Sequence, residues 1–346
     1  MNSFSAEILR WFRENGRDLP WRETRDPYAI WLSEIILQQT RIAQGWEYWE
    51  RFMQTYPKVE DLAAASEDDV LKLWQGLGYY SRARNLHTAA KQIVALGAFP
   101  NTLEGIKSLK GVGDYTAAAI GSFAFDIPAA VVDGNVYRVL SRYFGIDTPV
   151  NSTQGKKEFA ALAQSLLPAS DAASYNQGMM DFGAIQCTPQ SPKCLLCPLA
   201  ETCEALRCGR VEELPVKNKT VKVKTRHLSY IYIRCKSSAA DGAGNTEPMV
   251  AIHRRGEGDI WQGLWEPYNV SDVKELPSFV KNPVLLAKDV KHVLTHRILL
   301  ADFYLLETES RPPLPDDYIW IRESEIEDYG VPRLIEIMLE KINPAE

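Results

Sequence analysis

The sequence has no long apolar run. Although 45% of its 346 residues are hydrophobic, none of its apolar stretches approaches the ~20 residues that a membrane-spanning helix needs. The first sixteen residues also lack the apolar core of a secretion signal. Ile8, Leu9 and Phe12 instead have helical spacing, which predicts an amphipathic helix that ends near Gly16. We therefore expect a cytoplasmic protein without a membrane partner.

Cysteine is scarce and unevenly distributed. Of six cysteines, four lie between residues 187 and 203. Such a cluster in a reducing compartment favours metal ligation over disulfide bonds. Cys208 and Cys235 lie outside the cluster, and we expect both to be buried or inert thiols.

The chain also lacks an excess of positive charge. Its formal net charge is −6, which counts mildly against a nucleic-acid partner. Polyanion binding needs only a local basic face, however. Residues 1–210 are near neutral, with 21 Lys and Arg against 23 Asp and Glu, and residues 217–226 hold five basic side chains and no acidic one. That basic run is either a solvated linker or a segment that lies along a phosphate backbone.

The hydrophobic pattern changes near residue 210. Before that point it is helical throughout, and no internal repeat is present. Beyond it, short β-rich runs occur at residues 228–235, 249–253, 261–270, 290–300 and 318–321. A helix is predicted over residues 332–342, and residues 236–247 have the composition of a flexible loop. We predict an all-helical domain over residues 1–209, a linker over 210–226 and an α+β domain over 227–346.

A glycine-built turn, Leu-Lys-Gly-Val-Gly at residues 109–113, begins the most informative stretch. Gly111 and Gly113 can adopt positive φ without a steric penalty, so the chain can reverse sharply there. The N–H groups at the start of the following Ala-rich helix would attract an anion such as a phosphate. Asp133, which follows two β-branched residues, comes soon afterwards. We interpret the pair as a phosphate clamp that positions a carboxylate, although such a turn also occurs as an ordinary helix end.

Glu34 is an unusual carboxylate. Asp26 and Pro27 predict the start of a helix, as its N-cap and its first residue. The one-turn neighbours of Glu34 on that helix are mostly apolar. On an arbitrary helix such a side chain would extend to the surface. If it is buried instead, desolvation raises its pKa and keeps part of the population protonated near neutral pH.

The four clustered cysteines have the spacing C-x6-C-x2-C-x5-C, from Cys187 through Cys194 and Cys197 to Cys203. Four thiolates so close in the chain can converge on one centre. Zinc usually takes two short pairs separated by a longer insert, whereas an iron–sulfur cubane tolerates wider and uneven loops. The spacing therefore favours an iron–sulfur cluster, with zinc as the alternative.

Three motifs follow one another in this chain: Ser-Glu-Ile-Ile-Leu-Gln-Gln-Thr at residues 33–40, the glycine turn with Val-Asp-Gly-Asn-Val at 132–136, and the four cysteines. Together they resemble the MutY family of adenine DNA glycosylases, which are helix-hairpin-helix proteins related to endonuclease III. The resemblance is strong from Leu9 to Cys203 and weaker beyond. It implies a helix-hairpin-helix at about residues 106–121 and a [4Fe-4S] cluster held by the four cysteines.

The resemblance also implies a function. It predicts base-excision repair of double-stranded DNA, in which a monomeric enzyme hydrolytically removes adenine mispaired with 8-oxoguanine or guanine. Its location would be bacterial-type: cytoplasmic and nucleoid-associated. Because a duplex hides the N-glycosidic bond, the adenine must be flipped out of the helix.

Individual residues acquire expected roles from the same resemblance. Glu34 is expected to protonate adenine N7 and then to activate water. Asp133 is expected to stabilise positive charge at C1′ or to bond to it transiently. Asn135 and Tyr115 would orient the carboxylates and the sugar. The residues of the helical part expected to contact DNA are Arg22, Gln39, Thr40, Leu77, Tyr79, Gly111, Gly113 and Lys193.

These DNA contacts differ in kind. Gln39 and Thr40 would fill or brace the space that the adenine vacates, and Leu77 and Tyr79 would hold the opposite base. Lys193 would meet a phosphate. The alternative for the segment that contains Leu77 and Tyr79 is core packing.

The C-terminal part resembles the Nudix-like domain of the same family, mainly through Trp-Gln-Gly-Leu-Trp-Glu at residues 261–266. Leu294-Thr295-His296 aligns with a Phe-Ser-His loop that probes the oxidised base in the family, so Thr295 and His296 are expected to do so here. An ordinary strand segment is the alternative. Residues 322–327 look like the Nudix metal-binding box, but they lack its upstream Gly and Glu, and Ile326 replaces a Glu. We therefore predict no pyrophosphatase activity.

One lysine is missing. In the lyase members of the superfamily an amine nucleophile follows the glycine hairpin, whereas here the position is Tyr115, and Tyr137 follows Asp-Gly-Asn-Val. Schiff-base chemistry requires an amine, so we expect a monofunctional glycosylase. One alternative is an endonuclease III-like glycosylase and lyase for oxidised pyrimidines, which Tyr115 and the second domain oppose. Another is a non-catalytic iron–sulfur DNA-binding protein, which the presence of both Glu34 and Asp133 opposes.

Overall fold

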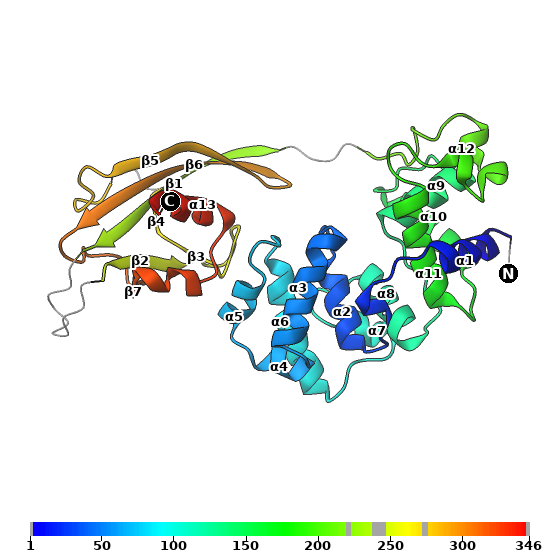
Figure 1. Cartoon of the computed structure of the whole chain (residues 1–346), viewed down its shortest axis with the longest axis horizontal. Coiled ribbons are helices and arrows are strands. Elements are labelled where there is room, and N and C mark those ends of the chain that lie inside the picture. The colour runs from blue at the N-terminus through cyan, green and yellow to red at the C-terminus, as the bar shows by residue number, and fades with distance from the viewer. Residues whose placement is uncertain (1–2, 219–222, 237–246, 272–275, 344–346) are drawn as a thin grey trace. The chain divides into compact units, whose positions relative to one another are not determined.

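The computed structural model describes residues 3–218, 223–236, 247–271 and 276–343 (Figure 1). The chain divides into two compact units, Met1–Ala64 with Asn85–Lys219 and Ala65–Arg84 with Thr220–Glu346. The second unit thus includes a segment that the sequence assigns to the helical domain, and the predicted domain limits stay a prediction. The predicted loop at 236–247 lies almost entirely outside the described residues, as does the middle of the basic run at 217–226. In the ranges described, no helix is both long and apolar enough to cross a lipid bilayer.

The first unit is helical over its described residues, as the sequence predicts. Its longer helices are α1 (Ser3–Asn15), α2 (Pro27–Ile36), α3 (Ile42–Thr55), α4 (Val59–Ala64), most of α6 (Ser81–Leu96), α7 (Leu103–Lys107), α8 (Asp114–Phe125), α9 (Gly134–Phe144), α10 (Thr153–Leu166), α11 (Ala172–Asp181) and α12 (Glu204–Arg207). Short helical turns join them: η1 (Pro20–Arg22), the π-helical turn η2 (Phe182–Gln186), η3 (Cys194–Leu196) and η4 (Ala200–Thr202).

Capping residues fix the starts of the two helices that matter most for the site. Asp26 precedes α2 and accepts a hydrogen bond from the N–H of Tyr28, with Pro27 as the first helical residue, as predicted. Asp133 precedes α9 and accepts the N–H groups of both Asn135 and Val136. A side chain that satisfies free N–H groups in this way typically stabilises a helix by ~1 kcal/mol. The two helix starts are therefore set by local sequence.

The core of the first unit holds α9 in place. Its buried apolar side chains come from α1, α9, α10 and α11 and include Ile8, Leu140, Phe159 and Met179. A side chain of this size gains about 1.5–3 kcal/mol from full burial. Because α9 is packed on several sides, the carboxylate at its first turn has a fixed origin.

The second unit is a mixed sheet with helices. Its strands are β1 (Lys224–Cys235), β2 (Met249–Arg254), β3 (Trp265–Glu266), β4 (Tyr268–Asn269), β5 (Val284–Val293), β6 (Arg297–Thr308) and β7 (Tyr318–Arg322), and its helices are α5 (Glu67–Leu73), η5 (Glu323–Asp328) and α13 (Arg333–Ile342). The strand order is β3-β2-β1-β6-β5, with β4 pairing β1 and β7 pairing β2. β1 and β6 run parallel, and the other pairs are antiparallel.

Alternating residues of β1 build two cores on the two faces of this sheet. Tyr230 and Tyr232 point to the face that α13 covers (Figure 1), whereas Ile231 and Ile233 point to the other. The predicted helix near residues 332–342 is confirmed as α13, with Pro332 as its N-cap.

The β-rich run predicted at residues 290–300 is interrupted. It contains the end of β5, a tight turn and the start of β6. The N–H of Leu294 donates to the carbonyl of Arg297 at 2.8 Å, which closes the turn. Thr295 and His296 consequently lie at an exposed hairpin tip, not within a strand.

Candidate active site

A cleft of about 550 Å³ opens in the first unit where the end of α2, the first turns of α8 and α9 and the end of α11 meet. Six residues that the sequence singles out line it together: Glu34, Gln39, Thr40, Tyr115, Asp133 and Asn135. They come from three separate stretches of the chain. The fold therefore brings the predicted catalytic residues into one cavity.

Glu34 lies at the buried end of this cleft. It is 7% exposed and is surrounded on α2 by residues that are also buried. Burial raises the pKa of Glu34 to about 7; the hydrogen bond from Tyr115 opposes this shift, and the negative charge of Asp133 adds to it. The hydroxyl of Tyr115 donates to Oε2 of Glu34 at 3.0 Å. Near neutral pH both the acid and the carboxylate of Glu34 are therefore populated, as the sequence predicts.

Asp133 is held by three donors. Its Oδ1 accepts the N–H groups of Asn135 and Val136, each at 2.8 Å, and its Oδ2 accepts Nδ2 of Asn135 at 2.7 Å. Burial raises the pKa of Asp133, and these donors oppose that rise. The positive end of the α9 dipole also favours the carboxylate. The side chain is thus both a helix cap and an oriented carboxylate at the cleft.

Arg138 is a functional residue that sequence reasoning missed. It is buried and donates through Nη2 to Oδ1 of Asn135 at 2.8 Å, which leaves the amide nitrogen of Asn135 facing Asp133. Its Nε donates to the carbonyl of Cys187 at 2.7 Å. Periodicity gave no signal, because Arg138 is two residues from both Val136 and Leu140 and so lies on the opposite, polar side of α9, where a solvent-exposed arginine is expected. Arg138 therefore joins Cys187, the first predicted cluster ligand, to Asn135, a predicted catalytic residue.

Arg142, one turn further along α9, was missed for the same reason. Its Nη1 donates to Sγ of Cys187 at 3.4 Å and to the carbonyl of Thr188 at 2.7 Å. Its Nη2 donates to the carbonyl of Pro189, and its Nε to that of Leu214. The cysteine loop and the start of the predicted linker are therefore both fastened to α9.

The four clustered cysteines suit an iron–sulfur cluster. All four are half-buried thiols without a disulfide bond. Burial, together with the neighbouring thiols Cys187, Cys203 and Cys194, raises the pKa of Cys197 to about 11. Thiols this close are deprotonated when a cationic metal centre binds them, and the donor Arg142 is of the kind that stabilises a cluster sulfur. The residues present fit the group.

The two glycines of the turn differ in conformation. Gly111 has φ of 78°, which a side chain would strain, and a Cβ there would lie 2.7 Å from Cβ of Asn85. Gly113 does not use the positive φ that is open to glycine: it has φ of −96° and ψ of −178° and is the N-cap of α8, and its contact with DNA stays a prediction. No atom lies within 4 Å of a Cβ built on Gly113, so the start of α8 is open. Asp114 in that first turn is paired with Lys107.

Arg22 does not present a free guanidinium. Both terminal nitrogens of Arg22 donate to the carboxylate of Asp181 at 2.8 Å. Arg17 is paired with the same carboxylate, and the Asp181 side chain is fully buried. These hydrogen bonds lower the pKa of Asp181 although burial raises it. A direct contact between Arg22 and DNA stays a prediction, and it would require this pair to separate.

Gln39 and Thr40 lie in the turn after α2, where both line the cleft. Gln39 is exposed and has φ of 58°, a conformation that costs a non-glycine residue of the order of 1 kcal/mol. Lys193 is also exposed, in the cysteine loop. These placements leave all three side chains accessible, and their DNA contacts stay predictions.

The other predicted DNA contacts belong to the second unit. Tyr79 is 47% exposed with φ of 48°, and its hydroxyl is hydrogen-bonded to Oγ1 of Thr295 at the β5–β6 tip. His296 is exposed beside it. Leu77 is only 8% exposed, so its predicted contact with a base would require the turn to open. Among the predicted DNA-contacting residues of the second unit, the structure therefore brings Tyr79 and Thr295 into contact.

Comparisons with known proteins agree with this geometry. Three family models match: HhH-GPD superfamily base excision DNA repair protein over residues 32–169, iron-sulfur binding domain of endonuclease III over 187–203, and NUDIX domain over 244–341. The adenine DNA glycosylase of Buchnera aphidicola (subsp. Schizaphis graminum) is 30% identical over 355 residues, which cover 97% of this chain and 98% of that protein. The chain belongs to the adenine DNA glycosylase family.

Other relatives match over less of their length. The adenine DNA glycosylase of Mus musculus is 42% identical over 229 residues, which cover 62% of this chain and 44% of that protein. A solved thermostable thymine-DNA glycosylase is 35% identical with a TM-score of 0.56, covering 59% of this chain and 95% of that one. Because the latter is named for a different base, the helical fold alone does not set which base is removed.

Family membership confirms the cofactor predicted from the sequence. The iron–sulfur model begins at Cys187 and ends at Cys203, the first and last of the four predicted ligands. A [4Fe-4S] cluster is the cofactor of this family. The assignment of each cysteine as a ligand stays a prediction, supported by the contacts of Arg142 with Cys187.

The raised pKa of Glu34 predicts a measurable effect on stability. A glutamate in the unfolded chain has a pKa near 4.5, against about 7 in the folded protein. The stabilisation from the buried neutral carboxyl is therefore complete below about pH 4.5 and is lost as the pH rises through about 7. Above that pH, the charged side chain costs the fold on the order of 3 kcal/mol.

Glu34→Gln should accordingly raise the melting temperature at pH 8 and have a much smaller effect near pH 5. Thermal unfolding of both proteins at the two pH values measures this difference. A difference that is the same at both pH values would show that Glu34 is not buried with a raised pKa.

Proposed function

We propose that this protein removes adenine from double-stranded DNA by hydrolysis, and that it acts on adenine mispaired with 8-oxoguanine or guanine. One observation carries the proposal: a buried carboxylate, Glu34, and a half-buried one, Asp133, line one cleft, and the hydroxyl of Tyr115 donates to Glu34. Departure of a base from a sugar requires a proton donor at the base and a carboxylate near C1′. The cleft supplies both.

The two carboxylates differ in their hydrogen bonds, and this sets their roles. Glu34, with a pKa near 7, can protonate the leaving adenine and then, as a carboxylate, take a proton from the attacking water. Asp133 faces three N–H donors that favour its ionised form, so it is suited to stabilise an oxocarbenium ion. Asn135 keeps Asp133 in place because Arg138 binds its amide oxygen.

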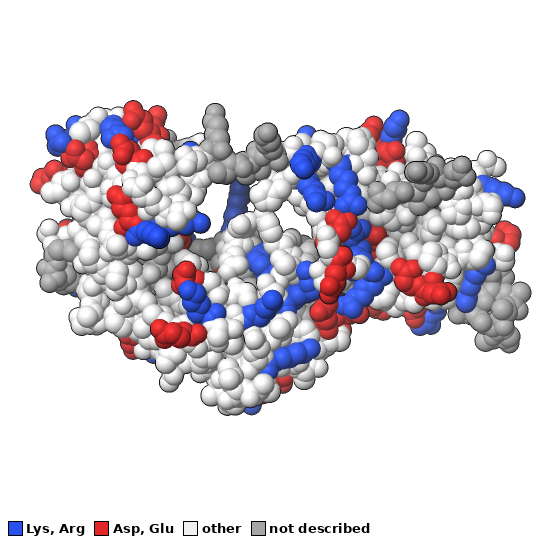
Figure 2. Space-filling view, turned by 180° about the vertical axis from the view of Figure 1, so that it is seen from behind, with Lys and Arg blue, Asp and Glu red and all other residues white. Residues whose placement is uncertain are grey.

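The surroundings of the cleft support a duplex substrate. Gln39 and Thr40 stand at its margin, where they can occupy the space left by a flipped base. Figure 2 shows basic and acidic side chains interspersed over one face of the molecule, with uncharged areas between them. We therefore assign phosphate contacts to local groups, namely the open start of α8 at Gly113 and the exposed Lys193.

The cleft also supports a monofunctional enzyme. Among its described lining residues the only cationic side chains are Arg17 and Arg41, and none is a lysine. A guanidinium does not form a Schiff base under these conditions, whereas a lysine amine does. Strand cleavage by a lyase step is therefore not expected.

A single-turnover reaction tests the proposed function. The substrate is a short duplex with one adenine opposite 8-oxoguanine or guanine, and half of each sample is treated with alkali. We expect strand scission only after alkali, because base removal leaves an intact but alkali-labile strand. Scission without alkali would point to a lyase such as endonuclease III. An intact strand in both halves, from protein with its cluster loaded, would favour a non-catalytic DNA-binding protein.

A further inference from the structure

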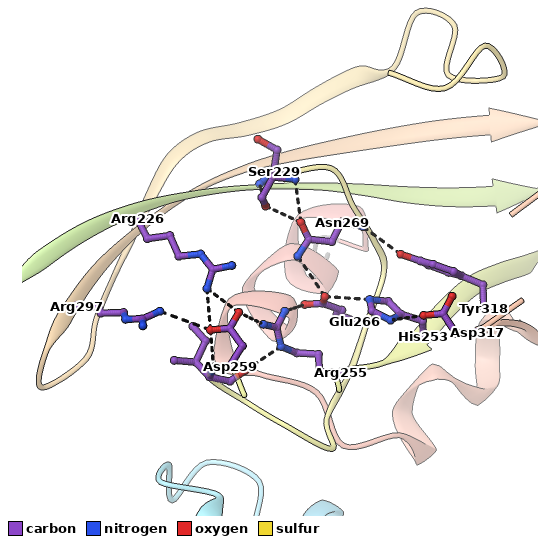
Figure 3. A network of polar contacts seen from close by, with 12 residues as sticks. Arg226, Ser229, His253, Arg255, Asp259, Glu266, Asn269, Arg297, Asp317 and Tyr318 are labelled. Carbon is purple, nitrogen blue, oxygen red and sulfur yellow. Dashed lines mark hydrogen bonds and ion pairs between the residues drawn. The ribbon is translucent and has the colours of Figure 1, made fainter. Parts of the chain in front are cut away.

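Asp259 is a point at which three arginines of the C-terminal sheet meet (Figure 3). Its carboxylate accepts Nη1 of Arg226 at 2.6 and 2.8 Å and Nη2 of Arg255 at 2.9 Å, and Nη1 of Arg297 lies 3.5 Å away. It also accepts the N–H of Ile260 at 2.7 Å. The Asp259 side chain is 32% exposed, so the cluster lies at the edge of the core. One carboxylate therefore collects contacts from three elements.

These three arginines lie on separate elements that the sheet brings together. Arg226 is in β1, Arg297 begins β6, and Arg255 follows β2. β1 and β6 are parallel, with Lys224 opposite Arg297, so the side chains of residues 226 and 297 share one face. Asp259 reaches that face from the loop at residues 255–264, which is closed by backbone hydrogen bonds of 2.8 and 2.9 Å at Arg255.

Arg297 connects Asp259 to the exposed hairpin tip. Its carbonyl closes the turn of Thr295 and His296, while its guanidinium faces Asp259. The same loop also touches the other strand of the hairpin, because the ring of Trp261 lies 5.9 Å from that of His292 in β5. The loop at 255–264 therefore supports the base of the hairpin from both strands.

Behind Asp259 the support is buried. Arg255 is ion-paired with Glu266, and their side chains are 7% and 2% exposed. Glu266 is also bonded to His253 at 3.0 Å and to Asn269 at 3.2 Å (Figure 3). Separating such a buried pair is costly, since it leaves an uncompensated charge. The anchor of the hairpin is accordingly rigid.

We propose that Asp259 is a positioning residue for recognition of the base opposite the adenine. Through Arg297 it fixes the direction of the turn that carries Thr295 and His296. This inference rests on the proposed function and on the role that the family resemblance predicts for that turn, namely probing the oxidised base. Discrimination that depends on hydrogen bonds requires donors and acceptors held in place, and a loosely supported turn loses it.

The test compares adenine release opposite 8-oxoguanine with release opposite guanine, under single-turnover conditions. Asp259→Asn and Arg297→Gln are expected to lower the ratio of the two rates by about tenfold, since couplings in such networks reach this size. The rate opposite guanine should change little. Asp317→Asn is the matched control, because Asp317 lies at the far end of the same network beside His253 and is 65% exposed. It should keep the wild-type ratio.

A double-variant experiment separates positioning from general destabilisation. If Asp259 acts through the turn, Asp259→Asn should lower the ratio no further in a protein that already carries Thr295→Ala. Arg297 is 44% exposed, so Arg297→Gln removes the contact between Asp259 and the turn without disturbing the buried ion pair of Arg255 and Glu266.

Three outcomes would each overturn the inference while the proposed function stands. The ratio of the two rates could be unchanged in both single variants, or the rates opposite both bases could fall equally. The loss in the ratio from Asp259→Asn could also add fully to that from Thr295→Ala. A wild-type protein that releases no adenine would overturn the proposed function and this inference with it.

Discussion

Glu34→Gln is expected to slow adenine release by about 10³-fold, within the range that positioned acid–base groups contribute. Glutamine keeps the size of glutamate, and its oxygen can still accept the Tyr115 hydroxyl that lies 3.0 Å from Oε2. It cannot donate a carboxyl proton to the leaving base or accept one from water. The measurement is a single-turnover rate with enzyme in excess over an adenine–8-oxoguanine duplex.

The pH dependence makes this prediction specific. Burial raises the pKa of Glu34 to about 7, so the wild-type rate should be nearly constant below that value and should fall about tenfold per pH unit above it. The variant should show no such decline.

Glu23→Gln, which neutralises an exposed carboxylate just before α2, serves as the control and should keep both the rate and the profile. If Glu34→Gln were as active as the wild type, the catalytic acid would lie elsewhere in the cleft.

Asp133→Asn is expected to slow the same step by about 10²–10³-fold, the size of effect seen when one preorganised electrostatic contact is lost. Asparagine is also a good N-cap, and its oxygen can still accept the N–H groups of Asn135 and Val136 that lie 2.8 Å from Oδ1. Its amide nitrogen would instead face Nδ2 of Asn135, and the negative charge near the sugar would be gone. Activity should therefore fall far more than stability.

The control for Asp133→Asn is Asp26→Asn, because Asp26 caps α2 with the same chemistry and receives the N–H of Tyr28 at 3.0 Å. Both variants should lose less than about 1 kcal/mol of unfolding free energy, but only Asp133→Asn should lose activity. Binding of the mispaired duplex should be retained by both, as a fluorescence anisotropy titration would measure. A loss of rate that merely follows a loss of folded protein would contradict a direct role for Asp133.

The turn between β5 and β6 could not be located from the sequence. Leu294-Thr295-His296-Arg297 contains no glycine, asparagine or proline, the residues that usually mark a two-residue turn. Local propensity therefore predicts a β-rich run over residues 290–300 without locating the turn inside it. The tight turn follows from the pairing of β6 with β5 on one side and with β1, which lies far away in the sequence, on the other.

Arg22 is a second example, in which the sequence did not reveal the partner of a charged side chain. Its sequence neighbourhood gives no sign of a partner, so a phosphate was a reasonable prediction. The carboxylate that it meets belongs to Asp181, 159 residues later in the chain, and the pair forms only when the end of α11 lies beside η1. Contacts of this range cannot be obtained from periodicity.

The sequence by itself determined the elements and the chemistry that each can perform. Asp26 and Asp133 specify helix starts, Gly111 specifies a left-handed position, and the cysteine spacing indicates a cluster, because each of these depends on residues close together in the chain. Only the tertiary structure decided the environment of each group. It buried Glu34 until its pKa rose to about 7, placed Arg138 between Asn135 and Cys187, and gathered three arginines on Asp259. Burial and long-range pairing depend on the packing of distant segments, and that is why they could be found only in the folded chain.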